Sequence, residues 1–588
     1  MSRHLAVVLV GLVAATGCFP VKSPGDSQLR FDPALMRSPP EVAEVSIQLL
    51  TSANKEGNAR LRVRFKESQK RPTFVIQGGA GPTLLRDDGS GADERAGDGV
   101  YSAFVNFDAE SYEAELKRRA ELARKAPELP VFRNRVLTGK KKTEIVFHKF
   151  SPGEIIPIQF PGGFPLLVDP ARELLITDVS VVEDPSRTFN PCNSTGTPMG
   201  PWTFGKLMTE MANEPATGIN PSDFVLHWLE QWSTDLTING FTVAQRVLGL
   251  NDRIINPWPK LPDGRLDLAK APFRLLAIVN RIDLRGSTVY GSGDAGEARF
   301  VFGLLLCSPK PNMPEAEPFT VIFEYGIKKA SCPDVRDWAQ QWEALGTLVL
   351  GSAAYNTALQ AITDQFSLRD ADPSKPPNRS ALNQLRTNEF AIAQFPVDAF
   401  WELREFKVCG DASACSLGKL EEVTLAQTPD HSFVNTVSLR DFVNSNESAI
   451  LAGTHVVPLQ LPPMTPFRAG SIQPGAGVAW NASGITNLDA RQIFSLATCA
   501  GCHTSETETR FVHIGPRNAG SPAALSDFLT GLNQPKTDPV SGVPRTFHDL
   551  LDRQGKLDAA AHMSCKLGKG FPFEDLFLPV FTPPGFPH

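Results

Sequence analysis

The sequence predicts a multidomain α+β protein, with an N-terminal β-sandwich, a large mixed α+β central domain and a small, mainly helical and irregular C-terminal domain. Its 588 residues correspond to three or four domains at roughly 150 residues per domain. The chain is 41% hydrophobic and 21% charged, which is typical of globular proteins and not of disordered ones. Its 46 glycines and 49 prolines predict many turns and short elements, and exclude a long helical bundle.

The first globular region, residues 41–150, has the pattern of a β-sandwich. Short strands with frequent turns are typical of two packed sheets. The residue patterns predict strands at 44–49, 60–65, 73–76 and 101–105. The segment 85–101 resembles the DDG…AGDGxY signature of immunoglobulin-like modules in exported bacterial proteins. Its aspartates favour a turn stabilised by side-chain hydrogen bonds, and a Ca²⁺ site is the less favoured alternative.

The central region, residues 165–475, mixes helical and strand patterns and is predicted to be one α+β domain. Predicted helices lie at 203–213, 222–232, 334–345 and 353–366, and predicted strands at 273–282, 298–306, 319–325 and 401–408. Phe224, Trp228 and Trp232 repeat every four residues and predict a helix face packed in the core.

No catalytic motif identifies the central region as an enzyme, and that question stays open. Its segment 273–283 is similar to stretches in uncharacterised exported bacterial proteins, a similarity that implies no activity. A polar cluster follows this predicted strand, and ion pairing at a sheet edge is favoured there over a pocket. The cluster consists of Asn280, Arg281, Asp283 and Arg285.

Residues 1–17 have the pattern of a secretory signal peptide, in which a charged start precedes a short apolar run. The run is shorter than the ~20 residues that span a bilayer. Small residues directly before Cys18 resemble the lipobox of bacterial lipoproteins. That resemblance implies cleavage after Gly17 and a lipid on Cys18, and the alternative is an ordinary signal peptide. Residues 18–40, rich in Pro, Ser and Asp, are predicted to form a flexible tether.

These features predict a protein of the bacterial cell envelope that is held to a membrane by its lipid anchor. Phe19 stands where inner-membrane lipoproteins often carry Asp, so the resemblance favours the outer membrane. The formal net charge of −6 gives no electrostatic reason to bind nucleic acid.

The C-terminal region, residues 480–588, carries a CxxCH motif at Cys499, Cys502 and His503. Two thiols at this spacing can each add to one vinyl group of a haem, and the next residue is an imidazole placed to bind the iron. The motif and the predicted helix over 491–498 resemble the start of a class I c-type cytochrome domain. The resemblance implies one haem c, two thioether bonds, His503 as the proximal ligand and a redox protein partner.

The second axial ligand is less defined by the sequence. Met563 follows His503 by 60 residues (563 − 503), close to where the cytochrome family often places its distal methionine. An open position is one alternative, and three histidines are the others, namely His513, His548 and His562. Two arginines are possible partners of a haem propionate, although a surface-loop role is commoner for such residues. They are Arg510 and Arg517.

The nine cysteines leave eight after lipidation of Cys18, and an exported compartment permits disulfides. Cys409 and Cys415 bracket a short loop and are a plausible pair, and Cys307 and Cys332, which follow two predicted strands, could also pair. The sequence alone does not fix the connectivity. The CxxC itself has two alternatives to haem. One is a structural disulfide, and the other is a zinc site drawn from Cys499, Cys502, Cys565 and one of His503, His513 or His548.

Three functions follow from this reading. The first is haem-linked electron transfer or redox sensing at the membrane. The second is a non-enzymatic surface, adhesion or ligand-binding lipoprotein, in which the CxxC is a structural disulfide. The third is an enzyme located in the central domain.

Overall fold

A computed structural model describes most of the chain from residue 42 onward. The described residues are 42–54, 57–65, 73–78, 81–105, 107, 155–157, 168–246, 250–285, 295–307, 316–390, 401–451, 453–473, 479–509, 511–547, 549–562 and 565. The predicted signal peptide, Cys18 and the tether lie outside the described residues. None of the helices in the described part is both long enough and apolar enough to cross a membrane.

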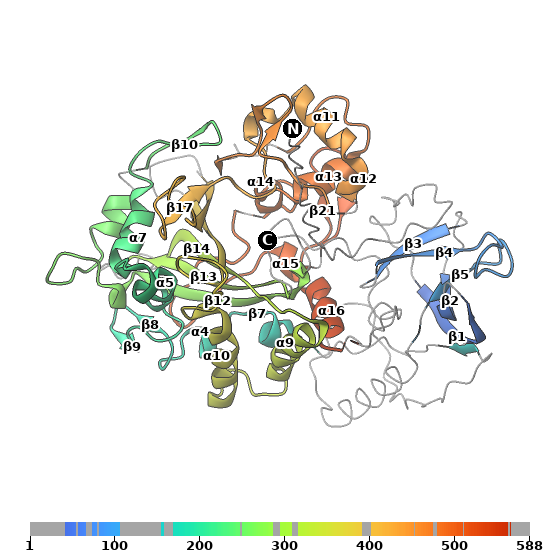
Figure 1. Ribbon diagram of the computed structural model, residues 1–588, viewed down its shortest axis with the longest axis horizontal. Coiled ribbons are helices and arrows are strands. Elements are labelled where there is room, and N and C mark those ends of the chain that lie inside the picture. The colour runs from blue at the N-terminus through green and yellow to red at the C-terminus, as the bar shows by residue number, and fades with distance from the viewer. Residues whose placement is uncertain are drawn as a thin grey trace, which may run out of the picture.

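The N-terminal region forms one six-stranded antiparallel sheet (blue in Figure 1), and all four predicted strands are confirmed. Ile47, Leu61 and Ala103 lie opposite one another on neighbouring strands and are buried, which accounts for the alternating pattern. A second sheet of a sandwich is not part of the described residues, so the immunoglobulin-like module stays a prediction. In spatial order the strands are β3 (Thr73–Gly78), β4 (Gly81–Arg86), β5 (Val100–Val105), β2 (Gly57–Phe65), β1 (Val42–Asn54) and β6 (Ile155–Pro157).

The aspartate-rich turn between β4 and β5 is held by its own side chains. Asp87 accepts hydrogen bonds from the backbone N–H groups of Asp98 and Gly99 at 3.0 and 3.1 Å. Asp93 accepts one from Gly89 at 2.6 Å, and Gly89 has a φ of 73° that favours glycine. The predicted turn with side-chain hydrogen bonds is therefore confirmed. Carboxylate oxygens of Asp87, Asp93 and Asp98 converge within 4.8 Å, and the Ca²⁺ site stays a prediction.

An eight-stranded antiparallel sheet organises the central region (Figure 1). The four predicted strands are confirmed, and β15 is an additional strand that the sequence pattern does not reveal. The sheet consists of β17 (Leu420–Val423), β16 (Trp401–Val408), β15 (Leu382–Phe390), β14 (Ala316–Gly326), β13 (Glu297–Leu305), β12 (Phe273–Arg281) and β7 (Leu175–Ile176) in this order, with β20 (Ser471–Ile472) paired to β16.

Helices cover one face of this sheet and bury the largest core of the molecule. All four predicted helices are confirmed: α5 (Phe204–Ala212), α7 (Pro221–Glu230), α9 (Cys332–Leu345) and α10 (Ala353–Ser367). Trp228 and Trp232 are fully buried, as their spacing predicts. Phe204 of α5 stacks on Phe273 of β12 with ring centroids 4.1 Å apart, which ties the helix layer to the sheet.

The opposite face of the sheet is covered by the C-terminal part of the chain (Figure 1). This part contains α11 (Val437–Ser445), α12 (Glu447–Leu451), α13 (Leu488–Leu496), α14 (Cys499–His503) and α15 (Asp527–Thr530). The last helix, α16 (Asp549–His562), packs instead against α9, and its Leu557 and Ala561 belong to the core on the other face of the sheet. Ala277 and Val301 of the sheet share a buried cluster with Leu496 and Phe528. Buried contacts therefore cross the predicted boundary near residue 480, and the CxxCH motif lies against the central sheet.

Short elements complete the described structure. They are α3 (Pro170–Glu173), α4 (Val179–Val182), α6 (Glu214–Thr217), η1 (Asn251–Ile255), η2 (Leu268–Lys270), η3 (Ile282–Leu284), η4 (His431–Phe433), and the hairpin strands β8 (Phe189–Asn190), β9 (Thr195–Gly196), β10 (Leu236–Ile238), β11 (Phe241–Val243), β18 (Gln460–Leu461), β19 (Thr465–Pro466), β21 (Lys536–Thr537) and β22 (Pro544–Arg545).

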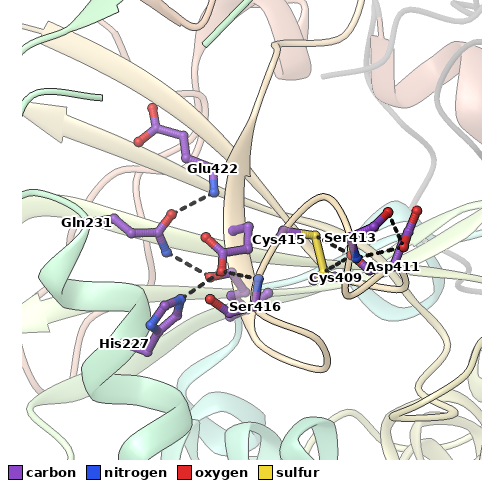
Figure 2. The surroundings of a disulfide bond; sticks show 10 residues. His227, Gln231, Cys409, Asp411, Ser413, Cys415, Ser416 and Glu422 are labelled. Atoms are coloured by element: carbon purple, nitrogen blue, oxygen red, sulfur yellow. Dashed lines mark hydrogen bonds and ion pairs between the residues drawn. A yellow bond between two sulfur atoms is a disulfide. The ribbon is translucent and has the colours of Figure 1, made fainter. Parts of the chain in front are cut away.

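Three disulfides join six of the eight described cysteines, and one of the two predicted pairs is correct. Cys409 bonds to Cys415 in a short loop beside His227 of α7 and Gln231, the residue after this helix (Figure 2). The predicted pair of Cys307 with Cys332 is wrong, because the fold brings a different partner to each of these cysteines. The other two disulfides are Cys192–Cys307 and Cys332–Cys565. The latter joins the start of α9 to the chain just after α16.

A buried carboxyl in α3 gives a prediction about pH. Burial raises the pKa of Glu173 to about 9, whereas an unperturbed glutamate has a pKa of 4.5. The native state therefore holds a proton that the unfolded state releases, so stability falls as pH rises from about 4.5 to about 9. Glu173→Gln cannot ionise. At pH 7.5 we expect it to be more stable than the wild type by up to about 4 kcal/mol, at about 1.4 kcal/mol per pH unit.

Denaturant unfolding at pH 4.5 and at pH 7.5 measures this effect. The two proteins should have similar stability at the lower pH and differ at the higher. Glu230→Gln, at an exposed position, is the control and should behave as the wild type. An unchanged pH dependence in the Glu173→Gln protein would contradict a protonated Glu173.

Candidate cofactor site

Two successive helix caps position the CxxCH motif. Asn487 accepts hydrogen bonds from the backbone of Asp489 and Ala490 and begins α13, the helix that the sequence predicts before the motif. Thr498 then begins α14, because its hydroxyl oxygen accepts a hydrogen bond from the N–H of Gly501 at 3.0 Å. The short helix α14 thus contains the whole motif, with the two cysteines three residues apart on one helical turn.

Both motif cysteines are buried and neither forms a disulfide. Burial raises the pKa of both thiols. Cys565 is bonded to Cys332, which removes it from the predicted zinc ligand set. The structure therefore places two cysteines that form no disulfide beside His503.

The imidazole of His503 is held in one orientation. Its Nδ1 lies 2.8 Å from the carbonyl oxygen of Phe511. A carbonyl only accepts, so Nδ1 carries the proton, and in the neutral ring the lone pair is on Nε2. Burial lowers the pKa of His503 to about 4, so the ring is neutral at physiological pH. Most histidines that bind a metal donate their other ring N–H to such an acceptor.

Two aromatic rings pack against His503. Trp401 of β16 stacks on it with centroids 5.5 Å apart and planes inclined by 26°. The ring of His513 lies 4.5 Å away, centroid to centroid. Nδ1 of His513 forms a hydrogen bond of 2.8 Å with the Ser526 hydroxyl, and its Nε2 lies 3.4 Å from Sγ of Cys502. The structure thus brings His513, one of the predicted alternatives for the second axial ligand, to the motif. It lies directly beside His503, the predicted proximal ligand.

Three of the other predicted site residues, Met563, His548 and Arg510, lie outside the described residues. His562 is the last residue of α16. Arg517 does not line the cavity described below. Its guanidinium group donates to the carbonyl oxygen of Leu275 at 2.9 Å and pairs with Glu183. The predicted distal role of Met563 therefore stays a prediction.

A cavity lies between α14 and the central sheet. Cys499, His503 and His513 line one side of it. Cys502 is not among the lining residues and packs behind them in the cluster that contains Ala277. Strands β7 and β12 to β16, the segment 512–514, α15 and α16 form the remaining walls.

The sheet side of the cavity carries buried charges that sequence reasoning missed. They pair across neighbouring strands, and Arg386 lies 3.0 Å from Glu324 and 3.1 Å from Glu405. Arg281 pairs with Asp283 at 2.8 Å, as the sequence predicts, but it also lines the cavity. The charged residues that line the cavity are Arg281, Arg299, Glu324, Arg386 and Arg553. Charged residues inside otherwise strand-like sequences, such as Arg299 in β13, Glu324 in β14 and Arg386 in β15, are the signal that could have identified them.

The glycine of the motif gives a second prediction. A Cβ atom on Gly501 would lie 2.0 Å from the backbone oxygen of Ser495, so α14 can pack this closely on α13 only with glycine here. Gly501→Ala should destabilise the protein by about 1–3 kcal/mol. Denaturant unfolding measures the loss. Gly515→Ala is the matched control, because its Cβ would have no neighbour nearer than 3.5 Å. Equal stability of the two variants would contradict the prediction.

Comparison of the chain with protein-family models, with curated proteins and with solved structures gave no match. Its function is therefore inferred from the chemistry and geometry of its own residues.

Proposed function

We propose that this chain is a lipid-anchored protein of the bacterial cell envelope that carries one covalently bound c-type haem and acts in electron transfer or redox sensing. The observation that carries the proposal is the state of His503. Its Nδ1–H is bound to the Phe511 carbonyl at 2.8 Å, the arrangement that is typical of a metal-binding histidine. His503 directly follows two cysteines that form no disulfide and lie on the same helical turn, and it lines a cavity.

The motif residues are of the kinds that hold a c-type haem. Cys499 and Cys502 supply the two thiols for thioether bonds, and His503 supplies the proximal nitrogen. Apolar side chains such as Val279, Val301 and Ile322 line the cavity and exclude water from it. When bound, the haem supplies one-electron chemistry, and the chain holds it, buries it and sets the charge around it.

The location and the partners are proposed from the sequence. Cys18 carries the lipid, the outer membrane is the favoured membrane, and a redox protein is the expected partner. The N-terminal strands are proposed to belong to an immunoglobulin-like module that separates the membrane from the haem. Cys18→Ser should release the protein from the membrane fraction, and a variant that stays membrane-bound would argue against a lipid anchor.

Covalent retention of haem tests the proposed function. The protein is produced together with cytochrome c maturation proteins and then denatured, and haem that stays with the polypeptide is measured. The wild type should retain one haem per chain. Cys499→Ala/Cys502→Ala should retain none, whereas Cys409→Ala/Cys415→Ala, which removes another pair of nearby cysteines, should retain haem. No retained haem in the wild type would favour a surface or ligand-binding lipoprotein in which the CxxC is structural.

A further inference from the structure

An exposed apolar hairpin belongs to the segment between α12 and α13. It spans residues 456–467, includes the paired strands β18 and β19, and is here called the 456–467 hairpin. Val456, Leu459 and Met464 of this hairpin are 53%, 51% and 75% exposed. They are three of the ten large apolar side chains that are exposed in the described part of the chain. Single exposed apolar residues are ordinary on protein surfaces, but a group of them in one short segment indicates an interaction site.

The hairpin is fixed to the rest of the fold at its base. Val457 and Phe467 are fully buried there, and the side-chain oxygen of Gln427 accepts a hydrogen bond from the N–H of Val457 at 2.7 Å. Asn239, in the turn between β10 and β11, donates to the carbonyl oxygen of Leu459 at 2.8 Å. The exposed side chains are therefore carried by a backbone that is already ordered, so that binding through them costs little additional conformational entropy.

The composition of the hairpin suits an apolar phase. Residues 456–467 include no charged side chain, and Gln460 and Thr465 are the polar ones. Four of the twelve residues are prolines, which have no backbone N–H that would lose a hydrogen bond to water. Because removing charged and polar groups from water is costly, a segment with few of them enters a lipid bilayer at low cost. A typical protein interface, in contrast, has a polar rim and several hydrogen bonds.

We propose that the 456–467 hairpin is a membrane contact, which inserts Val456, Leu459 and Met464 into the boundary between the headgroups and the acyl chains of a lipid bilayer. The inference rests on the proposed lipid anchor at Cys18, which keeps the hairpin at a high local concentration near the membrane. Without the anchor the hairpin binds weakly and reversibly, because three side chains bury little apolar area. Loss of the anchor therefore still releases the protein into dilute solution, and the N-terminal module sets the distance from the membrane whenever the hairpin is unbound.

Flotation with neutral phosphatidylcholine vesicles tests the contact. The parent protein is the mature chain from residue 18 onward with Cys18→Ser, so that it carries no lipid of its own. With vesicles in large excess it should float with them, and about 1 M salt should not release it, because the hairpin has no charge to screen. Leu459→Asp/Met464→Asp should weaken the partitioning by about tenfold or more, because a carboxylate opposes transfer into the bilayer.

Val349→Asp/Leu532→Asp is the matched control. These two apolar residues are 74% and 58% exposed, and they lie between α9 and α10 and after α15, outside the hairpin. This variant carries the same added charge and should float as the parent protein does. An equal loss of flotation in both variants would overturn the proposal, because the loss would then come from added charge and not from the hairpin.

The parent protein decides the question even if a variant fails to fold. A parent protein that does not float would overturn the inference and leave the proposed haem untouched, because retention of haem does not depend on the hairpin. Flotation that about 1 M salt abolishes would also overturn it, since charged groups elsewhere would then bind the vesicles. A parent protein that floats but retains no haem would support the membrane contact and remove the proposed electron transfer.

Discussion

His503→Ala is expected to abolish the spectrum of histidine-ligated haem while the haem stays attached through Cys499 and Cys502. The two thioether bonds are formed by the cysteine thiols and do not depend on the imidazole. The nitrogen that would bind the iron belongs to the imidazole and is lost with it. The shortened side chain leaves space beside Trp401, which stacks on His503 in the wild type. Added imidazole should enter this space and restore the spectrum, an effect that a general loss of structure would not show.

His513→Ala is the control for this prediction, because His513 lies beside His503 and also lines the cavity. Optical spectra of both variants, recorded with and without imidazole, provide the measurement. The His513→Ala protein should retain the spectrum of histidine-ligated haem. A normal spectrum in His503→Ala would show that another residue is the proximal ligand.

Removal of the disulfide between Cys332 and Cys565 is expected to have the largest effect on stability. The bond joins residues 233 positions apart in the chain, and closing so long a loop restricts the unfolded chain strongly. Cys332→Ser/Cys565→Ser should lower the free energy of unfolding by about 2–5 kcal/mol. The end of α16 should also loosen, and this helix supplies Arg553 to the cavity wall.

The disulfide Cys409–Cys415 provides the comparison, because its cysteines are only 6 positions apart. Cys409→Ser/Cys415→Ser should cost less stability than the loss of the long-range disulfide. Denaturant unfolding of the two double variants measures both losses. A larger loss in the short-loop variant would contradict this account of how α16 is held.

The elements that could be predicted from the sequence are those whose apolar side chains repeat at the spacing of a helix or of a strand. Phe224 and Trp228 repeat at helical spacing because one face of α7 packs on the sheet, and Trp232, just beyond the end of this helix, is buried in the same core. The strand β15 was missed because its sequence, LNQLRTNEF, carries polar residues on both faces. Those polar side chains are buried since they pair with charges on neighbouring strands, as Arg386 does, and a single strand does not reveal its partners.

The candidate site was predictable only in its local part. The spacing of Cys499, Cys502 and His503 identifies a motif without knowledge of the fold. The charged side of the cavity could not be predicted, because Arg299, Glu324 and Arg386 come from three separate strands and meet only in the folded sheet. The wrong pairing of Cys307 with Cys332 has the same cause, since disulfide partners are set by the fold and not by their order in the chain.

The mass of the tryptic peptide 492–510 tests the central claim most directly, because this peptide contains both motif cysteines and His503 between two arginine cleavage sites. The protein for this measurement is the full chain produced with cytochrome c maturation proteins. The proposal predicts a peptide heavier by one haem, with fragment ions that place it on Cys499 and Cys502. A peptide with two free thiols, or with a disulfide between them, would contradict it.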